Sequence, residues 1–195
     1  MPLRVFRRGG DGITVPYGPI FDGVRKNSGF KDVRGRPDLA AQIAEGGESK
    51  ALGNLLVRVA REDAYFSLGC DLGDHSEPES PAAQRQLAGG YIQVAATEYS
   101  EATTDQYDEF GEALATELRK RASSFHWRIE LVGTWVKFRL PGEPTVKSPS
   151  MWIWFFAAAR TKEKAVASRE SLIDAISDVL HMSKTARTLA IRHRS

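Results

Sequence analysis

Residues 151–159 read Met-Trp-Ile-Trp-Phe-Phe-Ala-Ala-Ala and form the longest apolar run in the chain. The run is too short to cross a membrane as a helix, because a spanning helix needs about 20 apolar residues. A short segment that is apolar on both faces is typical of a central strand covered from both sides. Trp152 and Trp154 share one of these faces. If that face were open in the monomer, we would expect a second subunit or another partner to cover it.

Alternation of apolar and polar residues predicts further strands before this run. One strand is expected over residues 91–98, and two more alternating patterns occupy residues 127–132 and 134–140. The apolar phase slips by one residue between these two patterns. Gly133 therefore marks either a tight hairpin turn or a bulge within one long strand.

A hairpin is expected earlier in the chain, where residues 54–60 and 64–71 alternate around a turn at residues 61–63. Residues 72–90 then form a connection. Within it, Ser80-Pro81 is expected to start one or two helical turns that Gly89-Gly90 ends.

One short helix and two main helices complete the pattern. A short one follows Pro37 and stops at Gly46-Gly47, a long one covers residues 104–123, and the last runs from Ser168 to about residue 181. The long helix begins with acidic and ends with basic side chains. This order complements the helix dipole, so these charges need no functional explanation.

This order of elements predicts an α+β fold, in which an antiparallel sheet of five to six strands is packed by two main helices as a two-layer sandwich. We expect a glycine-rich N-terminal arm (residues 1–36), a single domain (residues 37–182) and a basic C-terminal tail (residues 183–195). The arm contains scattered large apolar side chains, so it should lie on the domain or on a partner. In its element order, the domain resembles small two-layer domains of the secretion-chaperone type. That resemblance implies a domain that dimerises and holds partner chains.

The composition is ordinary for a soluble globular protein: 195 residues, 42% hydrophobic, 27% charged and a formal net charge of +2. Residues 62–112 hold twelve acidic side chains against one arginine, so they either pair within the fold or leave an acidic face. The single cysteine excludes an internal disulfide and a Cys-based zinc site. No apolar secretion signal follows the first arginines, so a cytoplasmic protein without membrane attachment is expected.

The sequence lacks a phosphate-binding loop, a nucleophile elbow and a dinucleotide fingerprint, so no cofactor is expected and catalysis is not favoured. The densest group of reactive side chains is Asp71, Asp74 and His75, close to Cys70. Carboxylates beside an imidazole could hold a metal ion and support hydrolysis. Alternatively, these residues form a polar turn that leaves a strand. Their negative charge disfavours ionisation of Cys70 and therefore a cysteine nucleophile.

Residues 134–140 combine an aromatic ring with cations. If Val136 faces the core, then Trp135, Lys137 and Arg139 face outward, as Arg128 does on the preceding segment. This pattern is typical of a protein interface, in which Trp and Arg are common anchors. It is also typical of single-stranded nucleic-acid binding, in which bases stack on the ring and cations contact phosphates. An amphipathic outer face on which a loop, the arm or a helix covers Trp135 would explain the same pattern without a binding role.

We therefore predict a non-enzymatic protein-binding or assembly module, either oligomeric or part of a complex, whose contact surface uses these four residues. A nucleic-acid-binding protein that uses the same face is the first alternative. A metal-assisted hydrolase at Asp71, Asp74 and His75 is the second.

Overall fold

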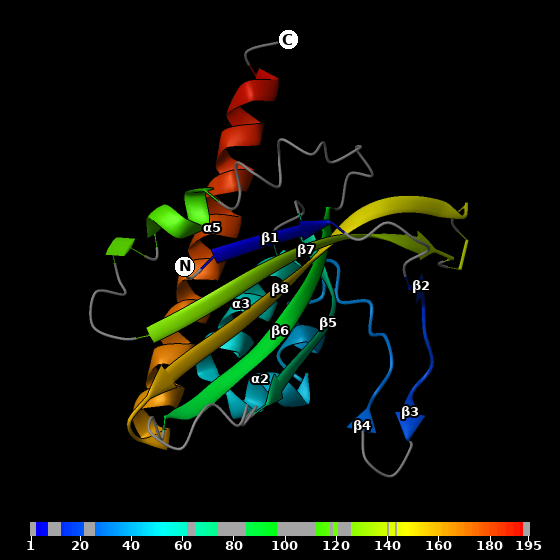
Figure 1. Ribbon diagram of the computed structural model, residues 1–195. Helices are drawn as coiled ribbons and strands as arrows, with labels where there is room; N and C mark the ends of the chain where they lie inside the picture. Colours follow the sequence, from blue (N-terminus) through cyan, green and yellow to red (C-terminus); the bar gives the residue numbers. More distant parts are fainter. Residues whose placement is uncertain are drawn as a thin grey trace.

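The structure is a computed structural model of the chain (Figure 1). It describes residues 3–7, 13–21, 26–61, 65–73, 85–96, 112–117, 119–120, 126–139, 141–142 and 144–192. These residues form an α+β fold, as expected, with a curved sheet and helices packed on one of its faces.

Six strands form the main sheet in the order β1-β7-β8-β6-β5, and β2 also pairs with β7. Their bounds are β1 (Leu3–Arg7), β2 (Thr14–Val15), β5 (Tyr65–Gly73), β6 (Gln86–Ala96), β7 (His126–Phe138) and β8 (Val146–Ala159). β3 (Ile20–Phe21) and β4 (Lys26–Asn27) form a separate antiparallel pair. The long apolar run is the central strand β8, and the number of strands is confirmed.

The expectation of a purely antiparallel sheet is wrong. β5, β6, β8 and β7 are antiparallel to their neighbours, but β1 and β2 both run parallel to β7. Parallel neighbours need a long connection, and more than a hundred residues separate β1 and β2 of the N-terminal arm from β7. The arm therefore contributes strands to the sheet.

Residues 50–61 form a helix, α3 (Lys50–Arg61), so the strand expected over residues 54–60 is wrong. Its buried side chains Leu52, Leu55, Leu56 and Val59 follow helical spacing. Ser49 caps the helix, because its Oγ accepts a hydrogen bond from the Leu52 N–H at 3.1 Å. The Glu170 carboxylate accepts hydrogen bonds from the Ser49 hydroxyl (2.8 Å) and the Ala51 N–H (3.0 Å), which adds negative charge at the positive end of the helix.

The helix expected after Pro37 is divided into α1 (Pro37–Ala40) and α2 (Ala44–Glu48). Gly46-Gly47 lies inside α2, so the predicted stop is wrong. Gly46 lies where two helices approach closely: a Cβ built on it would lie 3.0 Å from the Gly53 Cα of α3, and a Cβ on Gly53 would lie 2.8 Å from the Gly46 carbonyl oxygen.

Gly89-Gly90 lies inside β6, so the prediction that these glycines end a helical turn is wrong. Residues 74–84 of the predicted connection lie outside the described residues. A Cβ on Gly89 would lie 2.7 Å from the Phe156 ring, so a neighbouring side chain fills the space above this strand.

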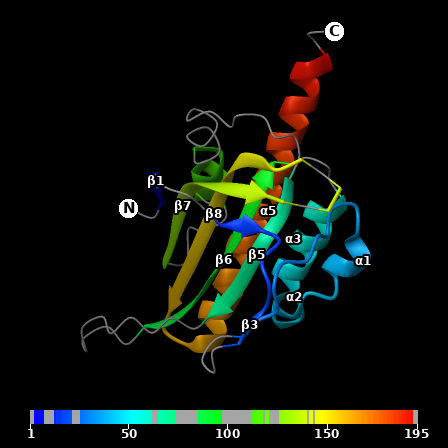
Figure 2. The same cartoon turned by 90° about the vertical axis from the view of Figure 1, so that its right-hand side faces the viewer.

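The last helix, α5 (Lys162–Arg192), starts before Ser168 and continues beyond residue 182 into the expected tail. Residues 112–117 and 119–120 are helical, as predicted for this region, and the rest of the 104–123 prediction lies outside the described residues. α5 packs on β8, β6 and α3, and α3 packs near β5. Figures 1 and 2 show these helices together behind one face of the sheet.

β7 explains the phase slip at Gly133. It is one continuous strand, because its pairing with β8 keeps one register from His126 to Phe138. Gly133 is therefore neither a hairpin turn nor a bulge against β8. Ile129 and Leu131 are buried in the core beneath the helices, whereas Val136 and Phe138 are buried on the opposite face.

The arm builds this second, smaller core. Val15 of β2 is buried against Val136 and Phe138, with Tyr17 and Phe30 packed around them. The backbone of the arm is fixed there as well, since the Lys137 N–H donates to the Ile13 carbonyl (2.9 Å) and the Arg139 N–H to that of Val15 (2.7 Å). The arm thus lies on its own domain at this point.

Candidate functional site

The face of the sheet opposite α3 and α5 carries an aromatic cluster made of Tyr91 on β6 and Trp152 and Trp154 on β8. The two indole rings stack with centroids 5.8 Å apart and planes 9° from parallel. The Tyr91 ring lies 4.8 and 4.7 Å from them, inclined by 45°. All three side chains are half-buried, whereas Ile153 and Phe155, between and beyond the two tryptophans, are fully buried on the helix side. β8 therefore has one sealed face and one accessible face.

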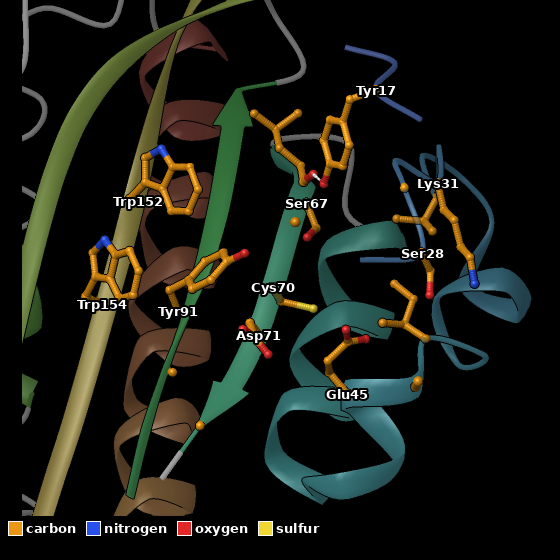
Figure 3. A pocket seen from close by; sticks show the side chains of 18 residues that line it. Tyr17, Ser28, Lys31, Glu45, Ser67, Cys70, Asp71, Tyr91, Trp152 and Trp154 are labelled. Atoms are coloured by element: carbon orange, nitrogen blue, oxygen red, sulfur yellow. Dashed lines mark hydrogen bonds between the residues drawn. The ribbon is translucent and has the colours of Figure 1, made fainter. Parts of the chain in front are cut away.

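A cavity of about 680 Å³ opens beside this cluster, and we call it the β5 cavity (Figure 3). Its lining includes the cluster itself, four residues of the arm between Ser28 and Val33, the start of α2 and six residues of β5. It is thus bounded by segments that lie far apart in the sequence.

β5 is the last strand of the sheet, and within the described residues its only strand partner is β6. Successive strand residues direct their backbone groups to opposite sides. The Asp71 carbonyl oxygen is the atom nearest to a Cβ built on Gly90 of β6, so it faces that strand. The backbone groups of Cys70 and Leu72 consequently point away from β6, toward the outer edge, beside the cavity.

Tyr17 holds the arm against one end of this edge. Its hydroxyl donates a hydrogen bond to the Leu68 carbonyl at 2.8 Å. Gly69 lies directly below that hydroxyl, since a Cβ there would approach it to 2.9 Å. A register shift between Ser67 and Gly69 marks the same point in β5. Beyond this contact, Cys70, Asp71 and Gly73 of β5 line the cavity.

The charged side chains that line the cavity are Lys31, Glu45 and Asp71. Burial, then the charges of Glu45 and Asp71, raise the pKa of the Cys70 thiol to about 12. Burial, followed by the charge of Asp71, also raises the pKa of Tyr91. At neutral pH both groups keep their protons, so Cys70 is a poor nucleophile, and the cavity beside them has a negative potential.

The predicted contact residues fall into two places. Trp135 is 38% exposed, and the Lys147 ammonium lies 5.2 Å from the centroid of its ring. Lys137 is paired across the strands with Lys147, and Arg139 is exposed just beyond β7. Trp135 and Lys137 share one face of β7 by alternation, which agrees with the prediction.

Arg128 lies apart from them, on the opposite face and toward the other end of β7. Its guanidinium carbon is 4.7 Å from the centroid of the Phe156 ring, and its Nε is 3.6 Å from a Glu130 carboxylate oxygen. The four predicted residues therefore do not form one surface.

Of the predicted hydrolase residues, Asp71 lies on β5 and lines the cavity, while Asp74 and His75 lie outside the described residues. Among the residues that the structure describes, no three His, Cys, Asp or Glu side chains are close enough to hold a metal ion. Within the same ranges, no helix combines the length and apolar character needed to cross a bilayer.

Comparison of the chain with protein-family models, curated proteins and solved structures finds no match. The site is therefore interpreted from its own geometry. The sequence predicts that Trp152 and Trp154 share one face of a strand. It does not predict that Asp71, Glu45 and the arm lie beside them. The available signal is the pair of glycines on either side of Asp71 in β5, Gly69 and Gly73, since a glycine within a strand often marks a close approach of another group.

Proposed function

We propose that the protein is a non-enzymatic binding module that captures an extended segment of a partner protein along the outer edge of β5. The observation that carries this proposal is the position of the β5 cavity, because six residues of the edge strand line it. An exposed strand edge offers unpaired N–H and C=O groups, to which a peptide can add as a further strand.

The dimensions favour a peptide. Beyond the Tyr17 contact at Leu68, β5 runs from Gly69 to its end at Gly73. A strand is usually about five or six residues long, so this part of the edge can pair with a partner strand. The aromatic cluster beside it offers a surface for alternate side chains of that peptide, which is how strand addition achieves specificity.

The backbone contact is tested with two substitutions at Leu72. Leu72→Pro removes an outward N–H and the side chain, whereas Leu72→Ala shortens the side chain and keeps the N–H. The immobilised protein is used to select from a display library of random peptides as long as β5. Selected peptides should bind the wild type and Leu72→Ala, and should lose about tenfold or more in affinity for Leu72→Pro.

Thermal unfolding must show that Leu72→Pro remains folded. If it does not, Cys70→Pro against Cys70→Ala repeats the comparison at the second outward position. Selection of no peptide, or equal affinity for the Pro and Ala variants, would contradict the proposal.

Nucleic-acid binding is a second candidate, supported by one observation at the far end of the β7–β8 pair. Lys137 and Lys147 lie directly opposite each other beside Trp135. Cations beside an exposed indole ring are the combination that single-stranded nucleic acids bind, because bases stack on the ring and cations contact phosphates. Binding of a single-stranded oligonucleotide that weakens steeply with salt and is lost in Trp135→Ala would support this candidate. Absence of binding at low salt would remove it.

A further inference from the structure

We propose that the captured segment carries a lysine or arginine side chain, and that the aromatic cluster together with Asp71 and Glu45 binds this cation. The inference rests on the proposed peptide capture and adds the chemistry of the side chain that is recognised.

The rings provide the first half of the site. Tyr91, Trp152 and Trp154 present a half-buried aromatic surface to the cavity, and aromatic faces attract cations within about 6 Å. The chain already uses this interaction on the same face of the sheet, where the Arg128 guanidinium lies over Phe156 at 4.7 Å. Phe156 is two residues from Trp154, so both rings lie on one row of β8.

The carboxylates provide the second half. Asp71 is directly opposite Tyr91 in the β5–β6 register, and Glu45 reaches the cavity from α2 (Figure 3). Both negative charges act on Tyr91 and on Cys70, since both raise the pKa of these groups. Lys31, on the arm side, is exposed and is the one cation among the lining residues that the structure describes. A cationic side chain therefore complements the charge of the cavity better than an anionic one.

The strand leaves room for such a side chain. Gly69, Asp71 and Gly73 share one face of β5. The Tyr17 hydroxyl covers Gly69, so Asp71 is the single β5 side chain on this face from Asp71 to Gly73. A peptide strand added at the edge directs every second side chain to this face. A long side chain can cross the strand beside Asp71 and Gly73 and reach the rings of β6 and β8.

The test repeats the peptide selection with the wild type and with the double variant Asp71→Asn, Glu45→Gln. Wild-type selections should be enriched in Lys or Arg at one fixed position. In a synthetic copy of a selected peptide, replacing that residue with Gln should weaken binding roughly tenfold. The double variant should bind the cationic and Gln peptides about equally. Glu48→Gln is the matched control, because Glu48 is an exposed acid of α2 outside the cavity lining.

The outcomes separate the two proposals. Peptides that depend on the Leu72 N–H but show no preference for a cation would overturn this inference and leave peptide capture intact. A preference for a cation that persists in the double variant would also overturn it, because the site would then lie elsewhere. Failure to select any peptide sensitive to Leu72→Pro would overturn the capture itself.

Discussion

The two faces of β8 differ in how completely the fold covers them. On one face Ile153 and Phe155 are fully buried beneath α5, and on the other Trp152 and Trp154 are half-buried at the edge of a cavity. Both faces are apolar, yet only one is sealed. A large aromatic surface that the fold leaves accessible is characteristic of an interaction site.

The largest effect on the free energy of unfolding is expected from truncating one side chain on each face of β8. Phe155→Ala should lower the free energy of unfolding by about 3–5 kcal/mol, because it opens a hole in a fully buried core. Trp154→Ala should cost less than about half of that, because water already reaches this side chain. Urea unfolding of the two variants gives the comparison directly. Equal losses would show that the accessible face stabilises the fold as much as the sealed one.

A smaller effect is expected where the arm meets β5. Tyr17→Phe removes the hydrogen bond to the Leu68 carbonyl and keeps the ring against Phe30, so the loss should be about 1 kcal/mol. The matched control is Phe30→Leu, which changes the ring contact and keeps the hydrogen bond. If Tyr17→Phe leaves the urea midpoint unchanged, the arm is not anchored through this hydroxyl.

The last effect depends on the pH and concerns the charge of the cavity. The thiol of Cys70 has a usual pKa of 9.0, and in the folded protein the pKa is raised to about 12. Above pH 9 the unfolded thiol ionises while the folded one does not. Its contribution to stability is therefore complete below pH 9 and is lost as the pH rises toward 12. The urea midpoint should decline over this range, and less so in Cys70→Ala.

The same thiol reports on Glu45. Alkylation of Cys70 by iodoacetamide at pH 8 should be slow in the wild type and faster in Glu45→Gln, because removing the negative charge lowers the pKa. Glu48→Gln should leave the rate unchanged. Equal rates in all three proteins would mean that Glu45 does not set the potential of the cavity.

Local sequence patterns were sufficient for much of the fold. β8 and β6 were predicted from apolar runs and alternation, and α5 from its helical spacing. Residues 54–60 were misassigned because Leu55, Val57 and Val59 also alternate. The Ser49 cap and the three- and four-residue spacing of the buried side chains from Leu52 to Val59 indicate a helix.

Long-range arrangement was the part that local patterns could not provide. The slip at Gly133 reflects a change in which face of β7 is covered, and that depends on the distant arm. The same holds for the site: β5, α2, the arm and β8 meet only in the folded chain. Trp135 and Lys137 could be placed on one face by alternation, but Arg128 could not be separated from them without knowing that β7 is one unbroken strand.

The central position of β8 also determines the order in which the sheet can assemble during synthesis. β8 joins β6 to β7, yet it is the last strand of the sheet to leave the ribosome. Until then the β5–β6 pair exposes the edge that β8 will occupy. The β1–β7 pair cannot join the β5–β6 pair in one sheet before β8 is present, because β8 lies between β7 and β6. Long-range pairing of this kind folds slowly and exposes strand edges. The nascent chain therefore presents an additional unpaired edge that the finished protein does not retain.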